Sequence, residues 1–70
     1  MSNRTETPLN LAETVRDACL DAALLAYEDA GIRGLCAEGR WEAAVDAIRD
    51  LDLAGVLESA ARSARVAPGR

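Results

Sequence analysis

Two rows of carboxylates and one cysteine are the side chains of this sequence best suited to chemistry. Each row repeats every four residues, a spacing that places its members on one face of a helix. Like charges at this spacing repel one another, so the rows indicate either a solvated surface or a site for a basic partner. The rows are Glu13, Asp17 and Asp21, and then Glu42, Asp46 and Asp50.

The residue types that would turn these carboxylates into a catalytic or metal site are missing. General acid–base catalysis by a carboxylate is usually supported by His, Lys or Tyr, and the sequence contains neither His nor Lys. A zinc site needs four ligands, and a di-metal site in a helical bundle uses Glu-x-x-His pairs. We therefore expect no enzymatic activity, no metal and no cofactor.

Cys36 is the residue that best fits a different, thiol-dependent function. It lies close in sequence to Arg33 and Arg40, and nearby positive charge lowers the pKa of a thiol. Because no His and no second nearby Cys would form a reactive pair with it, packing is the expected role. A disulfide to Cys19 is not expected, since one continuous helix would hold the two residues about 25 Å apart.

The charge of the chain limits its partners. The sequence has 12 acidic and eight basic residues, for a net charge of −4, so phosphate backbones repel it and direct nucleic-acid binding is not expected. No apolar run approaches the ~20 residues of a membrane span, and no basic amphipathic helix favours membrane attachment. The cysteine usage and the lack of a signal-peptide pattern predict a cytoplasmic protein.

Helical periodicity through most of the chain predicts an all-α fold, either a small three-helix bundle or a helical hairpin. Either Thr7-Pro8 or a capping box from Asn10 to Glu13 can begin the first helix. We expect one domain over residues 1–70, with flexible ends at about 1–6 and 67–70. The predicted helices are a long one at about 9–38, with Gly31 as an alternative end, a second at about 41–51 and a weaker third at about 53–65.

Small residues recur every four positions along the first helix and allow a second helix to approach closely. They are Thr14, Ala18, Ala22, Ala26, Ala30 and Gly34, and Gly31 and Gly34 are expected to be notches for a near neighbour. A 70-residue chain rich in Ala buries little apolar area, so we expect a homodimer or a partner subunit to stabilise it. The predicted interaction surface contains Ala26, Ala30, Gly34, Leu35, Trp41, Val45 and Ile48.

Residues 28–53 resemble the helical hairpin of a single tetratricopeptide repeat. The resemblance consists of a small turn residue, an aromatic residue soon after it, and then Ala and a large apolar residue on the second helix, carried by Leu35, Gly39, Trp41, Ala44 and Ile48. It implies a hairpin with Trp41 at its turn, and protein binding. Trp41 is expected to staple this hairpin, or alternatively to anchor another protein.

These features predict a non-catalytic interaction or regulatory protein that acts through helix packing, as a homodimer or an accessory subunit. One alternative is an acidic inhibitor, or an antitoxin-like protein, that neutralises a basic, nucleic-acid-binding partner. A second alternative is a thiol-dependent redox protein that uses Cys36.

Overall fold

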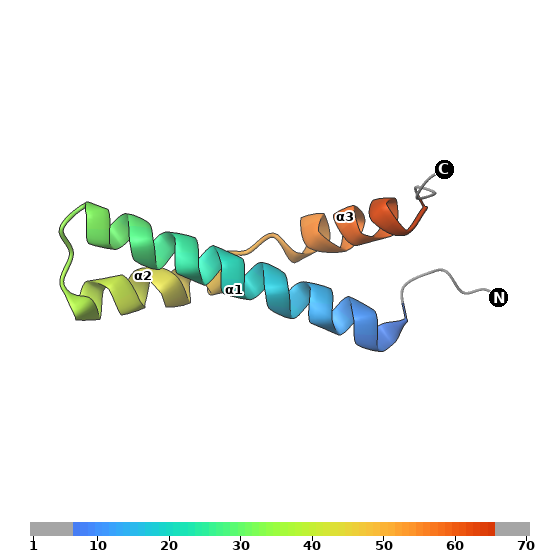
Figure 1. The fold of residues 1–70 in the computed structure, drawn as a ribbon, viewed down its shortest axis with the longest axis horizontal. Helices are drawn as coiled ribbons and strands as arrows, with labels where there is room; N and C mark the ends of the chain where they lie inside the picture. Colours follow the sequence, from blue (N-terminus) through green and yellow to red (C-terminus); the bar gives the residue numbers. More distant parts are fainter. Residues whose placement is uncertain (1–6, 66–70) are drawn as a thin grey trace. The chain divides into compact units, whose positions relative to one another are not determined.

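The computed structural model describes residues 7–65 and confirms the all-α prediction. Within this range the chain forms three helices and no strand (Figure 1). The flexible ends predicted at about 1–6 and 67–70 lie outside the described residues. The helices are α1 (Pro8–Ile32), α2 (Ala37–Arg49) and α3 (Leu53–Arg65).

The helices are distributed over two compact units. The hairpin unit, residues 17–51, consists of the second half of α1 and of α2, which run side by side in opposite directions (Figure 1). The other unit combines residues 7–16, the first turns of α1, with residues 52–65, which contain α3. Helix α1 therefore contributes its two halves to different units.

Thr7 and Pro8 begin α1, as the first of the two predicted start signals requires. The backbone N–H of Asn10 donates to the Thr7 side-chain oxygen at 3.1 Å, and the N–H of Leu11 donates to the Thr7 carbonyl at 2.9 Å. These bonds satisfy N–H groups that the helix itself leaves without acceptors. Thr7 is thus the N-cap, and Pro8 occupies the first helical position, where its missing N–H costs nothing.

The prediction that the first helix continues to about residue 38 is wrong. Helix α1 ends at Ile32, one residue after the alternative end at Gly31. Gly34 adopts a positive φ of 89°, its N–H donates to the Gly31 carbonyl at 3.0 Å, and the N–H of Leu35 donates to the Ala30 carbonyl at 2.9 Å. This pair of bonds is a Schellman motif, in which a left-handed glycine ends the helix.

The early end of α1 also shifts the second helix. Helix α2 begins at Ala37, with Cys36 as its N-cap, and ends at Arg49, so the predicted range of about 41–51 was too late at both ends. The third helix matches its predicted range of 53–65. Asp52 caps it, because its carboxylate accepts the N–H of Gly55 at 3.1 Å and its carbonyl accepts the N–H of Val56 at 3.1 Å.

The core of the described chain is made of alanine. Ala30, Ala44 and Ala60 are its buried apolar residues, and no large side chain is fully buried. Several leucines, one isoleucine and the tryptophan are instead more than half exposed. Because alanine removes little apolar area from water, each packed residue contributes little to the free energy of unfolding.

Candidate interaction surface

The small residues of α1 face the interior of the hairpin unit. Ala22 and Ala26 are half-buried, and Ala30 is fully buried at 0% exposure. Ala30 is thus covered by the chain itself and is not open to a partner, contrary to its prediction as an interaction residue. Gly34 lies in the turn with no heavy atom within 4 Å of the position its Cβ would occupy, so it is not the predicted notch.

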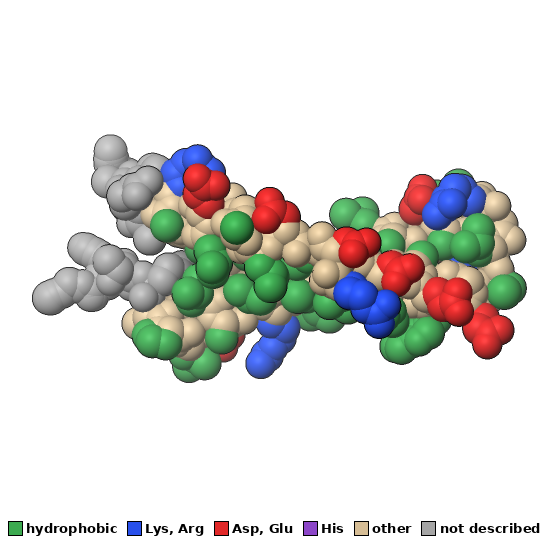
Figure 2. Space-filling view, turned by 180° about the vertical axis from the view of Figure 1, so that it is seen from behind, with side chains coloured by type: hydrophobic (Ala, Val, Ile, Leu, Met, Phe, Trp, Pro, Cys, Tyr) green, Lys and Arg blue, Asp and Glu red, His purple; other side chains and the backbone are tan. Residues whose placement is uncertain are grey.

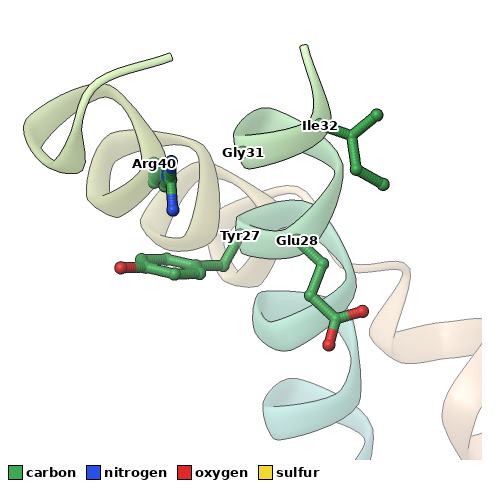
Figure 3. Close-up of a pocket in the computed structure, with 5 residues that line it drawn as sticks. All are labelled: Tyr27, Glu28, Gly31, Ile32 and Arg40. Atoms are coloured by element: carbon green, nitrogen blue, oxygen red, sulfur yellow. The ribbon is translucent and has the colours of Figure 1, made fainter. Parts of the chain in front are cut away.

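Gly31 is a notch, and Arg40 of α2 occupies it. A Cβ at Gly31 would lie 3.1 Å from the guanidinium carbon of Arg40, and that carbon is 5.9 Å from the centre of the Tyr27 ring (Figure 3). The Arg40 Nε donates to the Leu35 carbonyl at 3.0 Å. Arg40 therefore joins the end of α1, the turn and α2, and its cation is used within the hairpin unit.

Three of the predicted interaction residues form a stripe on α2. Trp41, Val45 and Ile48 are spaced at i, i+4 and i+7, which places them along one side of the helix. Trp41 is 65% exposed and Ile48 is 44% exposed, while Val45 is half-buried. The expectation that Trp41 staples the hairpin by burial is therefore wrong, because most of its ring faces solvent.

Helix α1 carries a second stripe that was not predicted as a site. Leu20, Leu24 and Tyr27 have the same i, i+4, i+7 spacing, and they are 53%, 60% and 39% exposed. Viewed along each helix from its N-terminus, each stripe lies about a quarter of a turn around the helix axis from the buried alanine of that helix. The direction of this rotation is the same for both helices. In an antiparallel pair this turns both stripes toward the same side, and we call these six residues the apolar strip.

Exposed carboxylates border the apolar strip along both helices. Asp17, Asp21 and Glu28 lie beyond the stripe of α1, and Glu38 and Glu42 lie beyond the stripe of α2. The other cations of the hairpin unit are paired elsewhere: Arg33 with Asp29 at 2.9 Å, and Arg49 with Asp46 at 3.4 Å. Figure 2 shows acidic side chains following one another along α2.

All six members of the two predicted acidic rows are exposed. Asp17, Asp21 and Glu42 border the apolar strip, while Asp46 is engaged by Arg49. Glu13 belongs to the other unit. The rows are therefore accessible, and three of their members lie next to exposed apolar side chains.

An open hollow lies at the turn end of α1. It has a volume of about 410 Å³ and is lined by Tyr27, Glu28, Gly31, Ile32 and Arg40 (Figure 3). Ile32, at 85% exposure, is the most exposed large apolar side chain of the described residues. Tyr27 belongs both to the hollow and to the apolar strip, so the two features are continuous.

Cys36 is exposed and lies at the N-terminus of α2. Its thiol makes no capping hydrogen bond of normal geometry, but the backbone N–H of Gly39, followed by that of Glu38, lowers the pKa of Cys36 below its usual value. The physical cause is the set of free N–H groups at a helix N-terminus, not the arginines considered from the sequence. That cause was missed because Cys36 was expected to lie inside a continuous helix.

The described residues show neither a metal cluster nor a membrane helix. Among residues 7–65, no three His, Cys, Asp or Glu side chains are grouped to hold an ion. None of α1, α2 and α3 combines the length and the apolar character that crossing a bilayer requires.

Comparison of the chain with protein-family models, with curated proteins and with solved structures found no match.

Proposed function

We propose that this protein is a non-catalytic interaction protein that acts through helix packing, as a homodimer or as an accessory subunit. The observation that supports the proposal is the inverted distribution of apolar residues. Alanines fill the interior of the hairpin unit, while Leu24, Ile32 and Trp41 are each at least 60% exposed. Apolar groups exposed together in this way are typical of protein–protein interaction sites.

The apolar strip contains residue types suited to anchoring a partner. Trp and Tyr are favoured at the centres of interfaces because they supply a large contact area with few rotatable bonds. Trp41 and Tyr27 lie on the two helices of the same hairpin, with the exposed Leu24 as an aliphatic neighbour. Covering these side chains would add the apolar burial that the alanine core lacks.

The test is the size of the protein in native extracts, compared with a variant in which Leu24, Trp41 and Ile48 are changed to Gln. We expect the unchanged chain to elute as a complex and the triple variant to elute at the monomer mass with its helical content retained. Sedimentation equilibrium of the purified chain then separates a homodimer from an accessory subunit. A chain that elutes as a monomer before any substitution contradicts the proposal.

A further inference from the structure

We propose that the apolar strip binds a basic amphipathic helix of another protein, whose apolar side chains contact the strip while its Arg and Lys side chains contact the carboxylates on both edges. This inference rests on the proposed function and names the partner by its chemistry. It concerns one surface of the hairpin unit, formed by Leu20, Leu24, Tyr27, Trp41, Val45 and Ile48.

The dimensions of the strip fit a short helix. From Leu20 to Tyr27 the stripe of α1 covers seven residues, or about 10 Å at 1.5 Å per residue. The hollow beside Gly31 and Ile32 extends this surface by about one more turn. A partner helix of about three to four turns therefore covers the whole surface, with one anchor side chain in the hollow.

The carboxylates on the two edges of the strip favour a partner with positive charge. Asp17, Asp21 and Glu28 lie along one edge of the strip, Glu38 and Glu42 lie along the other, and all five are exposed. The ion pairs found among the described residues, Arg33 with Asp29 and Arg49 with Asp46, involve none of these five carboxylates. An apolar surface with carboxylates on both edges matches a helix that has cations on both sides of its apolar face.

The same charges oppose a second copy of the chain on this surface. Two copies that met strip to strip would bring ten carboxylates together, because each strip has five such neighbours. The cations next to the strip are fewer: Arg16, one turn before Leu20, and Arg49, which pairs with Asp46. Like charges placed against each other across an interface lower affinity, whereas cations from a partner raise the rate of association. Charge complementarity thus favours a basic partner for the strip.

The experiment measures fluorescence anisotropy of three labelled synthetic helices of about 15 residues with the purified chain. The first has Leu at i, i+4, i+7 and i+11 and Arg or Lys elsewhere. The second keeps the Leu positions but carries Glu in place of the cations, and the third keeps the cations but has Ser in place of Leu. We expect the first helix to bind, with affinity that falls as ionic strength rises, and the other two to bind at least about tenfold more weakly.

Paired substitutions locate the site. Asp21→Asn with Glu28→Gln should weaken binding of the first helix about fivefold or more, while Asp50→Asn with Glu58→Gln makes the same change in net charge at exposed positions away from the strip and should leave binding unchanged. Leu24→Gln should weaken binding about tenfold, and Leu57→Gln, at another exposed leucine, should not.

Four results would overturn the inference. Equal binding of the acidic helix, or equal loss of affinity in the two charge pairs, would show that the carboxylates beside the strip do not choose the partner. A self-complex of the purified chain that Leu24→Gln dissociates would identify the second copy as the occupant. In that case the proposed function stands and this inference fails, whereas a chain that is monomeric in native extracts removes both.

Discussion

An ordinary amphipathic helix buries its larger apolar side chains, whereas α1 in the hairpin unit has small side chains on its inner face and larger apolar ones on its outer face. The inner face has Ala22, Ala26 and Ala30, and the outer face has Leu20 and Leu24, which are more than half exposed. The smaller side chains are inside because they allow α2 to approach closely. The comparison teaches that burial in this hairpin depends on how closely the two helices approach, and that its larger apolar residues remain available to a partner.

The largest effect on the free energy of unfolding is expected when a small residue of the inner face is replaced by a larger one. Ala30→Leu should destabilise the chain by about 3 kcal/mol, because Ala30 is fully buried and the added carbons have no space. Urea unfolding followed by circular dichroism measures the change. Ala12→Leu, the same substitution at an exposed position of α1, should change the free energy of unfolding by less than about 0.5 kcal/mol. Similar losses in both variants would contradict close packing at Ala30.

A second test alters the turn that brings the inner face of α1 to α2. Gly34→Ala should cost about 1 to 2 kcal/mol, because an L side chain is strained at a φ of 89° even though nothing surrounds the position. Thermal unfolding provides the measurement. Gly34→Asn is the control, since Asn accepts the left-handed conformation more readily and should cost less. Equal stability of the wild-type and Gly34→Ala chains would show that this turn does not need a left-handed residue.

A third test removes apolar character from the outer face. Leu24→Gln should change the free energy of unfolding by less than about 0.5 kcal/mol, because its side chain is 60% exposed in the free chain. Urea unfolding of the monomeric chain measures the change. A loss above about 2 kcal/mol, of the kind seen when a core leucine is removed, would place Leu24 in the interior instead.

The smallest expected effect concerns the two thiols, of which Cys19 is half-buried and Cys36 is exposed. The N–H groups of Gly39 and Glu38 lower the pKa of Cys36, so its thiolate forms at lower pH in the folded chain than in the unfolded chain. In a Cys19→Ser variant, the pH profile of iodoacetamide alkylation should shift to lower pH on folding. The thiolate interaction stabilises the fold above the unfolded pKa and is lost as pH falls through the folded pKa. Identical profiles in buffer and urea would contradict this assignment.

Local signals were enough to predict several features of the fold. The Thr7-Pro8 start, one of the two signals considered, and the third helix at 53–65 follow from residues close together in sequence, because a cap bonds to N–H groups within three or four positions. The end of α1 was predicted wrongly because the apolar spacing of Leu24, Tyr27 and Leu35 continues through the glycines. The left-handed conformation of Gly34 overrides that periodicity.

The candidate surface was predicted only in part. Trp41, Val45 and Ile48 were expected at an interface because of their types and spacing, and the structure leaves Trp41 65% exposed and Ile48 44% exposed. Leu20 and Leu24 carry the same spacing signal, but a sequence pattern does not show which apolar face of a helix is covered. Where α2 lies against α1 decides that question.

Helix propensity, charge and side-chain volume are properties of individual residues, so the helical character, the acidity and the lack of large core residues follow from the amino-acid sequence. The folded structure was needed to show that α1 ends at Ile32, that Cys36 occupies the N-cap position of α2 and that the alanines rather than the leucines are inside. The end of α1 depends on the backbone conformation of Gly34, which apolar periodicity does not reveal, and the burial of the alanines depends on contact between two helices. The Schellman turn sets the path of the chain, and the close approach of α1 and α2 selects the smallest side chains for the interior.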